Sequence, residues 1–337
     1  MKKKKRLFLL RFFILVLFGM LTTQMAAKER VVQPNLFPEM VYIRSGIFLM
    51  GNTRNDIEGD EDENHVHIVE LTYDYEIGKY EVTNSDYLEF INDAKVSSLG
   101  YLDGVKVVNL DSWSCEFYYD NGEFYLREKG KENYPVINVS WDEAINYCNW
   151  LSEKKGLAKA YDKDGNLIDI KGKITGNLAQ VEGYRLPTEV EWEYSARGGH
   201  KSEIDYKYSG SNVIHEVGWY WKNSGDKKTS EEWCFYGVLE NNSWTHEIGQ
   251  KQPNEIGIYD MSGNVWEWCH DYYCNMYYEN SPRVNPVNSK RSSYRVARGG
   301  SWFLYAKSSR VSNRFMFYSF LRDCDIGIRV TRTILNE

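Results

Sequence analysis

The sequence predicts an α+β domain built from short strands, few helices and much irregular loop. Two capped helical segments lie in the first half of the chain, and segments rich in Trp and Gly dominate the second half. No internal repeat and no Pro- or Gly-rich linker divides the text. A chain of 337 residues is long for one domain and short for three. Together these observations favour one α+β domain with many loops.

The first predicted elements are strands. Residues 40–50 read as two short strands around the turn at Ser45-Gly46. Residues 68–80 alternate apolar and polar side chains, as a half-buried strand does. Two later stretches, 97–133 and 162–183, are rich in Asp, Gly, Asn and Lys. We expect both to be insertions.

Three helix starts follow. Thr83 precedes a predicted helix over 84–94, and Pro187-Thr188-Glu189 opens a short third one. Between them, Ser140-Trp-Asp-Glu143 fits a capping box, in which the Ser and Glu side chains bond to each other's backbone N–H groups. The residues that recur at helical spacing after this box are Ala144, Tyr147, Cys148 and Leu151.

The N-terminus has the order of a secretory signal peptide. Basic residues 2–6 precede an apolar run over 12–21, which is followed by small residues that end at Ala27. The run is roughly half the ~20 residues that a spanning helix needs. We therefore predict a signal peptide over 1–27, a mature domain over 28–337, and a location in the periplasm, at the cell surface or outside the cell. No membrane span is expected after cleavage; an uncleaved membrane anchor is the alternative.

Charge restricts the class of partner. Without the six basic residues of 1–27, the chain has 35 basic and 48 acidic residues, a formal charge of −13. Nucleic-acid binding depends on neutralising phosphates with Lys and Arg, so no nucleic-acid partner is expected. Aromatic residues make up 15% of the chain and can form a core or a binding surface. The six cysteines permit disulfides in an oxidising compartment, and the sequence selects no pairing.

Seven segments, in order along nearly the whole mature chain, resemble the motifs of one family. They are 40–50, 78–83, 138–144, 183–199, 254–268, 298–302 and 327–329. Through these segments the chain is similar to the formylglycine-generating enzyme, or sulfatase-modifying factor, family. This resemblance implies a C-type-lectin-like α+β fold with long loops. Its members include oxidases, non-haem iron synthases, surface and secretion proteins, and hypervariable ligand-binding proteins of diversity-generating retroelements, so the fold alone selects no function.

The catalytic cysteine pair of this family is missing. The resemblance places two cysteines, spaced C-x4-C, shortly after the Gly-Gly-Ser motif, where they bind Cu(I). Leu304 and Ser309 stand at those positions. Neither a hydrocarbon nor an alcohol replaces a thiolate for a soft ion, so no copper is expected. The C-x4-C spacing of Cys269 and Cys274 lies in a different part of the family fold.

A structural calcium site is implied by the same resemblance. The segment 260–267 resembles the family's Ca²⁺ loop. The carry-over assigns the side chains of Asp260 and Glu267 and the backbone carbonyls of Gly263 and Val265. Carboxylate and carbonyl oxygens are the ligands that Ca²⁺ takes. The alternative is a Gly-Asn turn without an ion.

The C-terminal segment 303–325 is the predicted binding surface. Where family members usually carry loop residues, this chain has an aromatic and apolar run over 315–321, interrupted only by Ser319. We expect a solvent-facing loop that binds a protein or glycan, because exposed apolar patches mark binding sites. A buried strand is the alternative. The candidate ligand-binding residues are Phe303, Leu304, Tyr305, Lys307, Ser308, Phe315, Met316, Phe317, Tyr318, Phe320, Asp323 and Asp325.

This segment also resembles the variable region of retroelement-diversified proteins. Randomised adenines in Asn codons yield Phe, Leu, Tyr, Ser, Asp and Cys, and the gap residues are mostly of that set. The predicted function is a non-catalytic, exported ligand-binding protein. Two alternatives remain: a metal-dependent oxidoreductase of the same fold with altered chemistry, and a structural component of a surface or secretion assembly.

Overall fold

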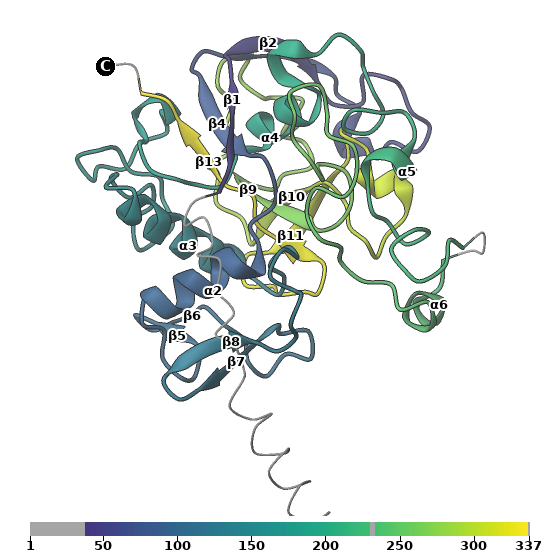
Figure 1. Ribbon diagram of the computed structural model, residues 1–337. Helices are drawn as coiled ribbons and strands as arrows, with labels where there is room; N and C mark the ends of the chain where they lie inside the picture. Colours follow the sequence, from purple (N-terminus) through teal and green to yellow (C-terminus); the bar gives the residue numbers. More distant parts are fainter. Residues whose placement is uncertain (1–37, 230–232, 336–337) are drawn as a thin grey trace, which may run out of the picture. The chain divides into compact units, whose positions relative to one another are not determined.

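The computed structural model describes residues 38–229 and 233–335, all within one compact unit that spans Phe37–Glu337. The predicted signal peptide and its cleavage site lie outside the described residues. Among the residues that the structure describes, no helix is long and apolar enough to cross a membrane. The predicted α+β class is confirmed, with many short strands, few helices and long irregular connections (Figure 1).

The N-terminal strands confirm one prediction from the sequence and contradict another. β1 (Met40–Ile43) and β2 (Gly46–Met50) flank the predicted turn. The single strand predicted over 68–80 is wrong, because it is divided into β3 (His67–Leu71) and β4 (Tyr75–Gly78). At the break, the N–H of Thr72 donates to the side chain of Asn285, at 2.9 Å. The backbone stops pairing with β2 after Leu71, although apolar and polar residues continue to alternate in the sequence.

The domain contains two larger sheets, the first of which joins its two ends. The first has the order β1-β4-β13, so a strand near the C-terminus pairs with one near the N-terminus. The second has the order β11-β10-β9-β12, which makes β11 an edge strand. The bounds of the strands in these sheets that have not yet been given are β9 (Trp266–Tyr272), β10 (Tyr294–Arg298), β11 (Arg314–Tyr318), β12 (Ile326–Gly327) and β13 (Thr331–Thr333).

The three predicted helix starts are confirmed. α2 (Asn84–Asp93), α3 (Trp141–Lys154) and α4 (Glu189–Ala196) begin after Thr83, Ser140 and Thr188, and each start forms a capping box. These boxes satisfy N–H groups that the first turn leaves unpaired. The remaining helices are short: α5 (Ile214–Val217), α6 (Phe235–Glu240), and the 3-10 turns η1 (Glu61–Glu63), η2 (Leu178–Gln180), η3 (Gly199–Lys201) and η4 (Ala306–Ser309).

The segment 97–133, predicted as an insertion, forms two small hairpins. They are β5 (Tyr101–Leu102) with β6 (Val105–Lys106), and β7 (Phe117–Asp120) with β8 (Glu123–Leu126). In Figure 1 they lie beyond α2, away from the β1-β4-β13 sheet. Asn92 of α2 fixes β8 with two side-chain bonds to the backbone of Phe124, at 2.8 and 3.0 Å.

The prediction of a solvent-facing loop over 315–321 needs correction. Residues 314–318 form β11, which pairs with β10 in continuous antiparallel register from Tyr294↔Tyr318 to Arg298↔Arg314. Phe and Tyr favour strands because their rings pack well on a pleated, half-buried surface, and β10 provides the partner strand here. The alternative of a buried strand is also only half right, because β11 lies at an edge and keeps several side chains exposed.

Candidate functional site

Buried arginine–glutamate pairs form the framework around the candidate surface. Arg310 binds Glu63, and Arg314 binds Glu189, with almost no side-chain exposure in either pair. Burial alone would raise the pKa of Glu189, but Arg314 and Arg298 hold that pKa below its ordinary value. Four further pairs of this kind lie among the described residues: Arg185–Glu191, Arg298–Glu189, Arg298–Glu193 and Arg329–Glu267.

The framework arginines alternate in sequence with surface residues. Arg310 and Arg314 point inward, whereas the run after Arg314 turns large apolar groups to solvent. Phe317 and Leu304 are only partly exposed, and so are Phe303 and Ser308. The candidate ligand-binding residues at the surface are Tyr305, Lys307, Phe315, Met316, Tyr318, Phe320 and Asp323.

The two faces of β11 differ. Phe315 and Phe317 share one face and lie against Trp266, with ring centroids 5.5 and 6.1 Å from its ring. Met316 and Tyr318 occupy the other face, as the period of two in a strand requires. Tyr318 is braced by Tyr294 of β10, whose hydroxyl donates to the Tyr318 hydroxyl at 2.9 Å. Both faces of the edge strand therefore present aromatic or apolar groups.

The outer edge of β11 is open at its centre. Ser319 N–H donates to Ser293 C=O at 3.4 Å, which marks those two residues as a hydrogen-bonded pair. Because hydrogen-bonded and non-bonded pairs alternate in an antiparallel ladder, the pair Val296↔Met316 is non-bonded. The N–H and C=O of Met316 consequently point away from β10. This is the geometry at which another strand can be added.

The region of the missing cysteine pair is packed rather than open. Leu304 packs partly buried against the core, and its carbonyl accepts from the N–H of Trp221 at 3.2 Å. Ser309 is fully buried, and its hydroxyl finds no hydrogen-bond partner among the described residues. Phe303, beside Leu304, contacts Trp233 and Trp302 with ring centroids 5.5 and 5.3 Å away.

Asp325 is the candidate residue that the fold removes from the surface. It is buried and accepts a hydrogen bond from the hydroxyl of Ser301 at 2.7 Å. Burial, opposed in part by Ser301, raises the pKa of Asp325 to about 7. Its backbone carbonyl accepts from Trp266 at 2.7 Å, which connects this turn to β9. Asp325 therefore acts inside the framework, while Asp323 remains exposed.

Asp260, Gly263 and Val265 lie on the loop before β9, and Glu267 lies in β9 itself. Asp260 is buried, and its Oδ2 accepts from Gly249 N–H at 2.7 Å, whereas its Oδ1 has no hydrogen-bond partner among the described residues. Glu267 accepts from Arg329 and, at 2.6 Å, from the indole of Trp192. The unpartnered Oδ1 of Asp260 is available to bind a cation. The Glu267 carboxylate is already paired with the Arg329 guanidinium, which makes it a weaker candidate ligand.

Burial raises the pKa of Asp260 to about 6, with the nearby Glu267 carboxylate acting in the same direction. No cluster of three His, Cys, Asp or Glu side chains that could hold a metal is found in ranges 38–229 and 233–335. A calcium site here would therefore depend on the carbonyls of Gly263 and Val265. The assignment of these four residues as calcium ligands remains a prediction.

All six cysteines lie in the described ranges and all are unpaired. Cys324 is the one inside the candidate segment, and burial together with Asp325 raises the pKa of its thiol. Burial likewise raises the pKa of Cys269, while Cys274 is only partly buried. A buried thiol with a raised pKa stays protonated, and the thiolate is the form that binds metals.

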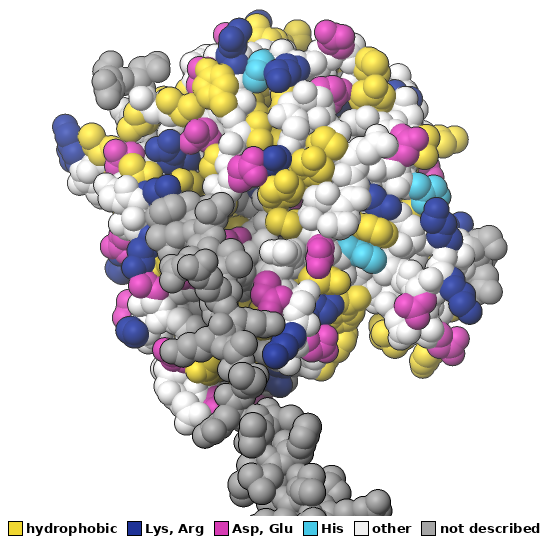
Figure 2. Space-filling model, in the orientation of Figure 1, with side chains coloured by type: hydrophobic (Ala, Val, Ile, Leu, Met, Phe, Trp, Pro, Cys, Tyr) yellow, Lys and Arg dark blue, Asp and Glu magenta, His cyan; other side chains and the backbone are white. Residues whose placement is uncertain are grey.

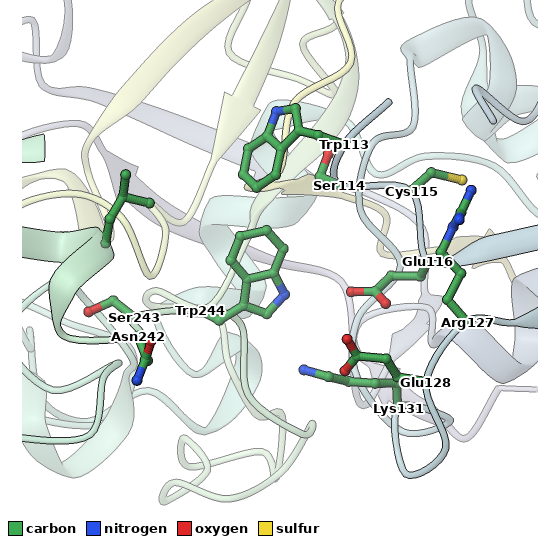
Figure 3. Close-up of a pocket in the computed structure, with 11 residues that line it drawn as sticks. Trp113, Ser114, Cys115, Glu116, Arg127, Glu128, Lys131, Asn242, Ser243 and Trp244 are labelled. Carbon is green, nitrogen blue, oxygen red and sulfur yellow. The ribbon is translucent and has the colours of Figure 1, made fainter. Parts of the chain in front are cut away.

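A cavity that sequence reasoning missed lies between the loop before β7 and the loop after α6. Trp113 and Trp244 form its aromatic wall, with ring centroids 5.5 Å apart at 66° (Figure 3). Trp113 is 75% exposed. Its only sequence signal is an isolated Trp between serines in the 97–133 segment, and a sequence alone does not show which residues oppose it.

The view in Figure 2 shows acidic and basic side chains interspersed on the visible face, with hydrophobic groups between them. On the part that grey atoms leave visible, no continuous basic stripe is present. This distribution differs from the concentrated positive charge that phosphate-backbone binding uses.

Comparison with known proteins gives the class. The model of the sulfatase-modifying factor enzyme 1-like domain matches residues 25–334, so the chain belongs to this family. Chaperone protein LppX of Paenibacillus barcinonensis is 35% identical over 269 residues, which cover 77% of this chain and 80% of LppX. The formylglycine-generating enzyme of Mus musculus is 26% identical over 306 residues, or 81% of this chain and 68% of the enzyme.

Among solved structures, Treponema denticola variable protein 1 is similar with a TM-score of 0.60 and 28% identity, covering 88% of this chain and 95% of that chain. The predicted formylglycine-generating-enzyme-like fold is thereby confirmed. The proteins that this chain resembles include a formylglycine-generating enzyme, a chaperone and a variable protein. Family membership therefore does not identify the function, which has to be argued from the residues of the site.

Proposed function

We propose that this chain is a non-catalytic, exported ligand-binding protein that binds through residues 303–325. The observation that carries the proposal is the exposure of four large apolar side chains on and just after the edge strand β11. Contiguous exposed apolar groups mark interaction sites. The exposed fractions are 47% for Phe315, 39% for Met316, 43% for Tyr318 and 63% for Phe320.

The chemistry of the neighbouring positions supports binding rather than catalysis. Leu304 and Ser309 offer a hydrocarbon and a buried hydroxyl where the family's oxidases bring two thiolates. The Cys324 thiol, the cysteine of this segment, has its pKa raised by burial and so does not supply a thiolate. A soft copper ion has no matching ligand set in this segment.

The ligand we propose is an extended segment of a protein. The outward-facing N–H and C=O of Met316 can pair with an added strand, and Met316, Tyr318 and Phe320 then contact its side chains. Strand addition uses main-chain hydrogen bonds for affinity and side-chain contacts for specificity. A glycan offers no main-chain ladder to this edge, so glycan binding at β11 is the contrary outcome.

The test is selection of a random-peptide display library on the immobilised protein. We expect enriched peptides with alternating apolar residues, which bind wild type and lose at least about tenfold in affinity, or 1.4 kcal/mol, on Phe320→Asp. Met316→Pro removes the outward N–H and the exposed Met side chain but no hydrogen bond to β10, so it should preserve the fold and block strand addition. Peptides that bind Met316→Pro as well as wild type would contradict strand addition.

A matched control is Ile47→Asp on β2, because Ile47 is 59% exposed and lies away from residues 303–325 in sequence. It should leave peptide binding unchanged. A separate assay addresses catalysis: the copper-treated protein is incubated with a peptide that carries a sulfatase-type cysteine. Conversion of that cysteine to an aldehyde, with oxygen uptake, would overturn the non-catalytic proposal.

Export and diversification belong to the same proposal. The signal-like order of residues 1–27 supports export, and the likeness to a Treponema variable protein supports a variable binding segment. Cell fractionation with N-terminal sequencing tests the first, and a mature N-terminus near residue 28 is expected. A near-copy of the 303–325 coding segment beside a reverse-transcriptase gene tests the second; its absence from the genome would end that idea.

A further inference from the structure

The cavity beside Trp113 is separate from the β11 surface and has the features of a built binding site. Its volume is about 570 Å³, within the range of small-molecule sites. One wall comes from the loop that leads into β7 and from the chain after β8, and the other from residues that follow α6. Figure 3 shows the two indoles between these walls.

The Trp244 wall is rigid. Its backbone N–H donates to Ser224 C=O at 3.2 Å, and its ring packs against the buried Trp302 with centroids 5.0 Å apart. Trp302 is itself fixed, because its indole donates to the Cys324 carbonyl at 3.1 Å. Trp113, in contrast, contacts Trp244 at an angle and leaves most of its own ring to solvent. The indole of Trp244 is therefore held by its neighbours, whereas a face of the Trp113 indole is open to a ligand.

The polar lining is rich in hydrogen-bonding groups and balanced in charge. Glu116 and Glu128 are matched by Arg127 and Lys131 on the same wall (Figure 3). Burial raises the pKa of Glu116, while Lys131 opposes that shift. A balanced wall gives no net attraction for an anion or a cation, and it offers both acceptors and donors.

We propose that this cavity binds a neutral saccharide, with a pyranose ring stacked on Trp113 and its hydroxyls bonded to Glu116 and the neighbouring polar groups of the same wall. A pyranose has an apolar face of C–H groups and a rim of hydroxyls, each both donor and acceptor. That combination matches an exposed indole beside balanced polar groups. The site is independent of the peptide-binding surface at β11 and goes beyond it.

The test is titration of the full mature protein with a panel of neutral oligosaccharides, namely cellohexaose, chitohexaose, xylohexaose and mannohexaose. Tryptophan fluorescence and calorimetry report binding. We expect at least one to bind with Kd below about 1 mM, and Trp113→Ala to weaken it at least about tenfold with an unchanged Tm. Tyr236→Ala is the matched control, because Tyr236 on α6 is also 75% exposed but is not part of the lining.

The proposal is overturned if no sugar of the panel binds, if Trp113→Ala binds as wild type does, or if tetramethylammonium binds in a Trp113-dependent way in place of the sugars. Retained sugar binding in Phe320→Asp is expected, since β11 is a different surface.

Discussion

Arg314 and Glu189 join β11 to helix α4 through two parallel hydrogen bonds, each 2.7 Å long. Both side chains are buried, and the next residue along the strand, Phe315, is half exposed. The framework and the candidate binding surface are therefore adjacent in sequence, one residue apart. This arrangement lets surface residues change while the arginine keeps the strand in place.

Arg314→Met should destabilise the fold by about 3–5 kcal/mol, because it leaves the Glu189 carboxylate buried and unpaired. Chemical denaturation monitored by tryptophan fluorescence measures this change. Phe320→Asp, at an exposed position six residues later, should stay within about 0.5 kcal/mol of wild type. Equal stability of Arg314→Met and wild type would show that the two hydrogen bonds between Arg314 and Glu189 do not hold β11 in place.

Phe317→Ala should lower stability by about 1–3 kcal/mol, less than a fully buried Phe, because Phe317 is partly buried against Trp266 and Trp268. Phe317→Asp should be worse, since a carboxylate would replace the ring there. An Asp at position 320 should instead leave melting unchanged, because Phe320 is 63% exposed. Parallel thermal melts of the Phe317 and Phe320 variants decide the point: similar melts would contradict this assignment.

Asp325→Asn should change how stability depends on pH. The folded-state pKa of Asp325 is raised to about 7, above its unfolded value, so the folded protein retains this proton more tightly. The corresponding stability is present in full below the unfolded pKa near 4 and is lost as pH rises toward 7, with a limiting slope of about 1.4 kcal/mol per unit.

Asn cannot ionise, so Asp325→Asn should gain stability relative to wild type as pH rises from about 4 to about 7, the interval between the unfolded and folded pKa values, and the difference should then level off. Denaturation midpoints across that interval measure the difference. Arginine-paired carboxylates such as Glu189, whose pKa is lowered, contribute with the opposite sign but equally in both proteins, so they cancel. A constant offset between the two curves would contradict the raised pKa.

Calcium should raise Tm if the loop of Asp260 holds the ion. The unpartnered Oδ1 of Asp260 would gain a ligand, and binding to the folded state alone stabilises it by mass action. Differential scanning fluorimetry with Ca²⁺, then with excess chelator, measures the shift. Asp260→Ala should remove it, and Mg²⁺ should give little, since it demands stricter geometry. A Ca²⁺ shift of the same size in Asp260→Ala would exclude this oxygen as a ligand.

Local patterns in the sequence predicted the elements that depend on near neighbours. Thr83, Ser140 and Thr188 cap helices through residues three positions away, so their boxes are visible in the text. The break between β3 and β4 was not visible, because the side chain that diverts Thr72 is Asn285, 213 residues later. Sequence separations of 62 to 247 residues likewise hid the glutamate partners of Arg298, Arg310, Arg314 and Arg329.

The sequence alone determined the family, the α+β class, the helix caps and the absence of a thiolate pair at positions 304 and 309, because these depend on residue identity and short spacing. The tertiary structure decided which candidate residues meet solvent: it buried Asp325, exposed Phe320, turned a predicted loop into the edge strand β11 and brought Trp113 to Trp244. Exposure depends on what packs opposite a side chain, and that neighbour comes from a distant part of the chain.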